Sequence, residues 1–163
     1  MVGTSLGSSR LWFTLAEGIL TEVYYPRIDI QQIRDLGFII ADDMGFWVEL
    51  RRLGSYDVKL PAPGVPAVEI VHRHTRFTFT LKVCPSQERD VLLLQYRLDG
   101  EQRLRPYALL GARLGGSADD NLAFVGSHPG RTVLWAEGGP FGRALSTIDG
   151  WGNHAGLRGA VGW

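Results

Sequence analysis

The chain has 163 residues, of which 45% are apolar and 21% charged, close to the averages of soluble globular proteins. Its 17 basic and 17 acidic residues cancel without forming a block of like charge, so neither nucleic acid nor an anionic membrane is expected as a partner. A single cysteine excludes an internal disulfide, and no Cys/His spacing indicates a metal or a cofactor.

The first third of the chain predicts short strands. Residues 1–6 are polar, so no leader is predicted, and the sequence leaves open whether the protein stays inside the cell or a leader precedes it. Alternation of apolar and polar residues then predicts strands at residues 10–15, 19–25, 36–41 and 46–51. Turn residues separate them, and only residues 30–36 here offer room for a helical turn.

The middle of the chain opens with residues 53–66, whose three prolines and two glycines predict a surface connection. Strands are predicted to follow at residues 68–74, 77–84, 91–98, 107–113 and 132–137, with another helical turn at residues 118–124. Cys84 ends the second of these strands, where a buried or half-buried strand residue is expected rather than a nucleophile.

Together these elements predict an all-β fold, an antiparallel sandwich of about ten or more strands. We expect one domain over residues 1–163, in which residues 1–145 form the regular sandwich. Residues 146–163 are rich in glycine and show no alternation, so an irregular C-terminal tail is expected there.

The most specific stretch is Tyr24-Tyr25-Pro26-Arg27-Ile28-Asp29, between the run 7–15 and the pair Arg34-Asp35. It closely resembles the N-terminal, non-catalytic domain of prokaryotic glucoamylases and glucodextranases, enzymes like those of glycoside hydrolase family 15. The resemblance implies a super-β-sandwich that precedes a catalytic (α/α) barrel, and a parent reaction that releases glucose from the non-reducing ends of α-glucans. Because the catalytic glutamates of that family belong to the barrel, none is carried over to this chain, which is expected to end before a barrel.

The same resemblance implies an interdomain contact that borders the substrate cleft. The residues that match are Tyr24, Tyr25, Pro26, Arg27, Asp29, Arg34 and Asp35. Alternation places Tyr24 and Tyr25 on opposite faces of a strand, so at least one ring is expected at the rim, where it can stack on a sugar. Arg27 and Asp29 can form a local ion pair or bind a hydroxylated ligand. The other interpretation, in which both tyrosines are core and corner residues, stays open.

Other candidate sites are weaker. The glutamates and aspartates fall at polar strand positions and in turns, so no acid and base pair for glycoside hydrolysis is predicted. His72 and His74 lie on one face of a strand without a third ligand nearby, so no metal site is expected. Trp12, Trp47 and Trp135 are expected in the core, and Trp151 and Trp163 at the surface.

The preferred hypothesis is therefore a non-catalytic sandwich domain, inactive alone, whose partner is a catalytic barrel and whose contact with α-glucans is weak. The alternative is a free-standing carbohydrate-binding sandwich that uses Tyr24 and Tyr25 as its platform. A surface that is built to pack against another domain exposes apolar area, and open sheet edges expose unpaired backbone groups, so a homo-oligomer is also expected.

Overall fold

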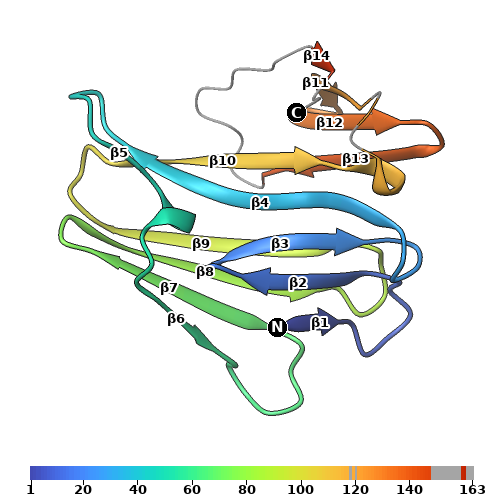
Figure 1. Ribbon diagram of the computed structural model, residues 1–163, viewed down its shortest axis with the longest axis horizontal. Coiled ribbons are helices and arrows are strands. Elements are labelled where there is room, and N and C mark those ends of the chain that lie inside the picture. Colours follow the sequence, from blue (N-terminus) through green and yellow to red (C-terminus); the bar gives the residue numbers. More distant parts are fainter. Residues whose placement is uncertain (118, 120, 148–158, 161–163) are drawn as a thin grey trace.

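The fold is all-β, with three antiparallel sheets and two short 3₁₀ helices, η1 (Leu50–Arg52) and η2 (Leu114–Gly116) (Figure 1). The computed structural model describes residues 1–117, 119, 121–147 and 159–160. Within these ranges, no helix is long and apolar enough to cross a membrane.

The first sheet has six strands. Along its main path the order is β1 (Val2–Thr4), β2 (Trp12–Ala16), β3 (Ile19–Tyr24), β4 (Gln31–Ala41) and β10 (Arg105–Ala112). The short strand β5 (Trp47–Glu49) pairs with the end of β4. The 11-residue strand β4 is therefore the centre of this sheet, with β3 and β5 along one edge and β10 along the other.

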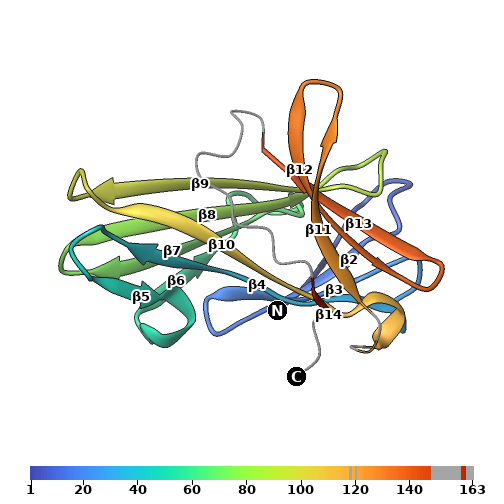
Figure 2. The same cartoon turned by 90° about the horizontal axis from the view of Figure 1, so that it is seen from above.

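The other two sheets have four strands each. The second sheet runs β6 (Tyr56–Lys59), β7 (Val68–His74), β8 (Phe77–Pro85) and β9 (Leu92–Gly100). The third sheet runs β13 (Phe141–Ser146), β12 (Arg131–Gly138), β11 (Leu122–His128) and β14 (Gly159–Ala160). Figures 1 and 2 show the first two sheets stacked as a sandwich, with the third sheet beyond β10.

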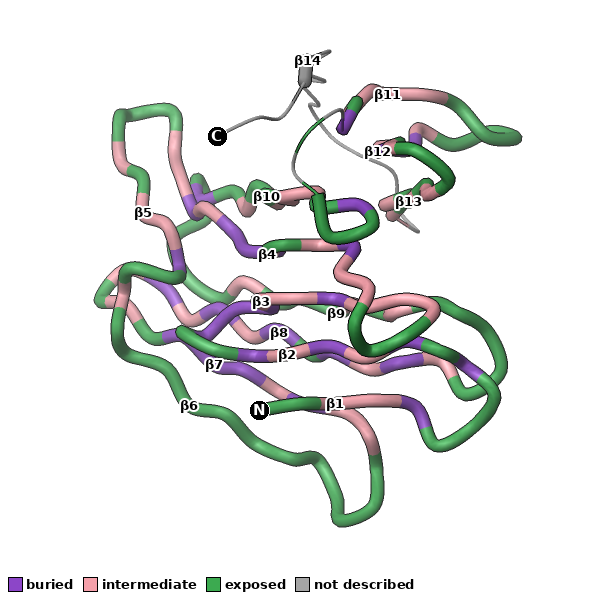
Figure 3. The backbone as a smooth tube through the Cα atoms, turned by 45° about the vertical axis from the view of Figure 1, so that its right-hand side comes forward, coloured by how far each residue is buried: buried purple, intermediate pink, exposed green. Residues whose placement is uncertain are grey.

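The hydrophobic core lies between the first and second sheets (Figure 3). Alternate residues of each strand face it, as the pleat of a strand requires. In β8, Phe77, Phe79, Leu81 and Val83 are 0–3% exposed, whereas the residues between them are half-buried or exposed. Phe13, Leu20 and Ile40 close the core from the first sheet, each 0% exposed.

The all-β prediction is confirmed, but several local predictions are wrong. The helical turn predicted at residues 30–36 is wrong, because β4 begins at Gln31, and residues 122–124 of the second predicted turn belong to β11. The segment 53–66 contains β6, which was predicted as a connection. Strands β1, β11 and β13 were not predicted, because their residues alternate poorly or include glycine.

Trp47 was expected in the core and is instead 62% exposed, because it lies on the outer side of β5. Trp12 and Trp135 are half-buried, so neither is a full core residue. Cys84 is half-buried in β8, as predicted. Trp151, Trp163 and most of the tail expected at residues 146–163 lie outside the described residues.

Candidate functional site

The residues that the sequence singled out lie at a corner of the sandwich, where β3 turns into β4. Tyr24 is the last residue of β3, and the peptide bond from Tyr25 to Pro26 is cis. The Tyr25 N–H donates to the carbonyl of Ile30 (3.0 Å), and the Gln32 side chain donates to the carbonyl of Tyr25 (2.7 Å). The corner is thus a tightly hydrogen-bonded loop that carries Arg27 and Asp29 at its exposed tip.

The two tyrosines face opposite sides of the first sheet. Tyr24 is paired directly with Trp12 on β2 and with Gln31 on β4, and all three point away from the core. Tyr25 packs against the hydrophobic core. Their divergence follows from the alternation of a strand, as the sequence indicated.

Tyr25 joins residues from distant parts of the chain. Its hydroxyl accepts a hydrogen bond from Arg10 (2.6 Å), which also forms an ion pair with Asp90 (2.9 Å) in the connection between β8 and β9. The guanidinium groups of Arg10 and of Arg143 on β13 lie 4.9 and 4.6 Å from the centroid of the Tyr25 ring. With two cations over it, the ring offers little free surface to a sugar.

The charges at this corner are strongly coupled. Hydrogen bonds from the Arg10 backbone and side chain hold the pKa of Asp90 below its usual value. Burial lowers the pKa of Arg143, whose Nε and Nη2 atoms are buried and have no hydrogen-bond partner among the described residues. The corner therefore ties all three sheets together through Tyr25, and its chemistry is that of a structural contact.

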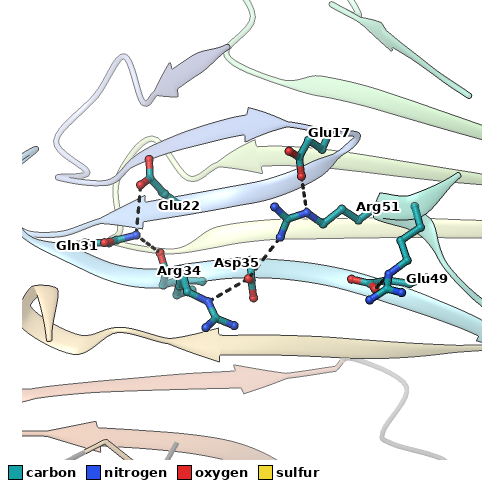
Figure 4. A network of polar contacts seen from close by, with 9 residues as sticks. Glu17, Glu22, Gln31, Arg34, Asp35, Glu49 and Arg51 are labelled. Atoms are coloured by element: carbon teal, nitrogen blue, oxygen red, sulfur yellow. Dashed lines mark hydrogen bonds and ion pairs between the residues drawn. The ribbon is translucent and has the colours of Figure 1, made fainter. Parts of the chain in front are cut away.

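A second group of candidates lies on the outer face of the first sheet, the face directed away from the core (Figure 4). Arg34 and Asp35, both on β4, form an ion pair (3.1 Å). Arg51 of η1 lies 3.9 Å from the same carboxylate and also pairs with Glu17 in the turn between β2 and β3. Charges of opposite sign therefore alternate across the sheet. Arg27 and Asp29 stand apart from this row and, within the described part of the chain, form an ion pair only with each other (2.6 Å).

Next to this row lies a cluster of uncharged donors and one carboxylate. Glu22 accepts hydrogen bonds from Thr14 (3.2 Å) and from Gln31 (3.4 Å). A hydrogen bond to Glu22 raises the pKa of Tyr24. The outer face thus satisfies most of its own polar groups, which suits a contact surface better than a reactive site.

The far end of the outer face is apolar. Ile39 on β4 is paired with Tyr107 on β10 and with Glu49 on β5. Trp47 lies two residues before Glu49 on β5, on the same face of the strand. Trp47 is 62% exposed, Tyr107 49% and Leu109 40%. The sequence did not predict this strip, because Trp47 was expected in the core. Alternation divides the residues of a strand between two faces but does not say which face is buried.

Two histidines were weighed as metal ligands. His72 is buried, and its Nε2–H donates to the carbonyl of Gly18 (2.8 Å), while His74 stacks on Phe77 with ring centroids 5.0 Å apart. Among the described residues, no group of three or more His, Cys, Asp or Glu side chains is arranged to hold a metal ion.

His72 makes the stability of the fold depend on pH. Burial holds its pKa below the ordinary value of 6.5, and a proton on Nδ1 would find no acceptor among the described residues. The unfolded chain takes up that proton first, so the free energy of unfolding should fall as the pH drops below 6.5, by up to about 1.4 kcal/mol per unit. Chemical denaturation between pH 7.5 and 5 measures this slope.

The matched controls for this slope are His72→Gln, which should flatten it, and His128→Gln at an exposed position of β11, which should not. An equal slope in all three proteins would show that His72 does not carry the effect.

Several residues of these two clusters were not predicted. Arg10 lies in the run 7–15 that flanks the stretch with the family resemblance, whereas Asp90 and Arg143 lie in a loop and a strand far along the chain. No sequence pattern indicated the ion pair of Arg51 and Glu17, because only the pairing of β2, β3 and β4 brings the two residues together.

Comparisons with known proteins agree over nearly the whole chain. A family model described as glucodextranase, domain N, matches residues 1–162. A glucoamylase of Clostridium sp. (strain G0005) is 24% identical over 153 residues, which are 90% of this chain and 22% of that protein. A crystal structure of a bacterial glucoamylase complexed with acarbose matches 92% of this chain and 23% of its own, with a TM-score of 0.88 and 24% identity. The fold is shared, and the chain spans less than a quarter of the length of these relatives.

Proposed function

Because the chain belongs to the glucodextranase domain N family, we propose that it is the non-catalytic β-sandwich of an α-glucan exo-hydrolase and supports a separate catalytic barrel. The observation that carries this proposal is the family match over residues 1–162. The relatives provide further support, since the chain corresponds to 22% and 23% of their lengths and leaves most of each protein for other parts.

The carboxyl groups support a non-catalytic role. Glycoside hydrolysis requires a carboxyl group that stays protonated because its pKa is raised, close to a second carboxylate. In this chain the pKa values of Asp42, Asp90 and Glu101 are lowered by arginine partners or backbone N–H groups. Glu17 and Asp35 are bound to arginines on the outer face. The lowered pKa values of Asp42, Asp90 and Glu101 suit these three groups to remain ionised rather than to donate a proton.

We assign the barrel contact to the outer face of the first sheet and the adjoining corner. Tyr24, Arg34 and Asp35 lie on that face, and Arg27 and Asp29 project from the loop beside it. Alternating charges on a flat sheet specify the orientation of a partner more than they strengthen its binding. This region is proposed to form one wall of the substrate cleft, with only weak contact to an α-glucan when the barrel is absent.

The test is hydrolysis by the purified chain. We expect no release of glucose from maltooligosaccharides, dextran or starch, because the family resemblance implies that the catalytic acid and base belong to the barrel. Glucose is measured against a preparation of the same protein with Tyr24→Ala and a mock purification. Release that follows the protein through purification, above the mock level, would contradict a non-catalytic role.

A carbohydrate-binding module is the second candidate, and the exposed rings of Trp47 and Tyr107 favour it. Tyr25 supports it less, because two guanidinium groups already cover its ring. Titration with maltooligosaccharides separates the two candidates. Saturation at micromolar ligand that is lost in Trp47→Ala would favour the binding module, whereas weak binding that is unchanged by Trp47→Ala agrees with a domain that supports a barrel.

A further inference from the structure

The two sheets of the sandwich end on the same side of the molecule. β9 is the last strand of the second sheet and β10 the last strand of the first, and residues 101–104 connect them. Seen from above in Figure 2, β9 ends and β10 begins on the left, away from the strands of the third sheet on the right. The half of this edge nearest the connection therefore has no covering strand in the described part of the chain.

The core is thinly covered along this edge. Leu94, Leu98 and Ala108 face the core but are only half-buried. Tyr96 is 51% exposed, although its ring lies 5.9 Å from those of both Phe38 and Phe79. One strand further in, the corresponding residues of β8 are 0–3% exposed. Apolar side chains beside an open strand edge mark a surface that pairs with another strand.

Strand β9 also lacks two features that protect edge strands, a proline and a β-bulge. It has nine residues, no proline, and an unbroken register with β8. By contrast, β10 carries Pro106, which removes a backbone donor. The connection after β9 is held in place by Arg76. Its side chain forms an ion pair with Glu101 (2.5 Å), and its backbone carbonyl accepts a hydrogen bond from the Glu101 N–H (3.3 Å). The edge is thus both open and rigid, which lowers the entropy cost of pairing.

We propose that a second copy of this chain pairs with β9, antiparallel to it, about a two-fold axis through Leu98. In this register Tyr96 lies opposite Gly100 of the second copy, and Arg97 lies opposite Asp99. Arg97 and Asp99 both point away from the core, are 76% and 50% exposed, and form an ion pair with each other within the chain (2.7 Å). The axis repeats the pair, so two ion pairs of opposite sense cross the interface.

This charge complementarity selects the second copy and the register. A two-fold axis through Tyr96 would instead place Gln95 opposite Arg97 and Leu93 opposite Asp99, which loses both ion pairs. It would also move the partner towards the end of β9 that the third sheet approaches in Figure 2. The axis through Leu98 uses only the free half of the strand, and it places Leu98 against Leu98 and Tyr96 against Gly100 of the second copy. The proposal is independent of whether the chain serves a barrel.

The experiment measures the mass of the full 163-residue chain by light scattering across a range of concentrations. We expect a concentration-dependent dimer. Arg97→Asp alone and Asp99→Arg alone should each weaken dimerisation about tenfold or more, because like charges then face each other twice. An equimolar mixture of the two variants should dimerise again, since each unlike pair is restored across the interface while neither chain regains its internal pair.

The control is Arg73→Asp on β7, which breaks an exposed ion pair with Asp57 of β6 at the opposite edge of the same sheet and should leave the dimer unchanged. Thermal unfolding of each variant checks that it is folded. A monomer at every concentration would overturn the proposal. So would a dimer that Arg97→Asp leaves intact, or a mixture of the two variants that stays monomeric.

Discussion

Replacing Phe79 by alanine is expected to lower the free energy of unfolding by about 4 kcal/mol. The ring of Phe79 on β8 is 0% exposed and lies 5.0 Å from the ring of Phe38 on the opposite sheet. Its removal opens a cavity between the two sheets that neither can fill without moving its backbone. For a domain whose total stability is about 5–15 kcal/mol, such a loss is a large fraction.

Urea denaturation at a fixed protein concentration measures this loss, since self-association would otherwise shift the midpoint. Two variants bracket the result. Phe79→Leu keeps most of the buried volume and should lose much less, while Leu93→Ala at a side chain that is 56% exposed should change stability by less than about 0.5 kcal/mol. If Phe79→Ala lost no more than Leu93→Ala, the core would not lie between these sheets.

Gly18→Ala is expected to have the second largest effect, a loss of roughly 3 kcal/mol. Gly18 has a φ of 73° in the turn between β2 and β3, where an alanine is strained. An added Cβ would also lie 2.4 Å from Cε1 of His72, which is buried and bound to the carbonyl of the same glycine. The side chain of His72 cannot move without breaking that hydrogen bond.

Gly54→Ala separates the two contributions. Gly54 has a similar φ of 65° but no atom within 4 Å of an added Cβ, so its substitution carries only the backbone strain, about 1 kcal/mol. The difference between the two variants measures the contact with His72. Equal losses would mean that the buried histidine yields freely, and the pH dependence assigned to it would then be smaller as well.

The sequence by itself determined the fold class and the family. Alternation in β8 and β9 and frequent turns predict strands, because a pleated strand exposes every second residue to the core. The stretch from Tyr24 to Asp29 carried the family resemblance, and the match over residues 1–162 confirmed it. Both signals are local in the chain, so no knowledge of strand order was needed.

The tertiary structure decided which face of each strand is buried and which distant residues come into contact. Pattern alone gives two faces to each strand but does not say which face is covered, so Trp47 was placed inside although β5 turns it outwards. The three sheets meet at Tyr25 only because residues Arg10, Asp90 and Arg143 come together across strand pairings that span the whole chain. The open edge at β9 likewise depends on strand order, because a strand becomes an edge only through the neighbours it lacks.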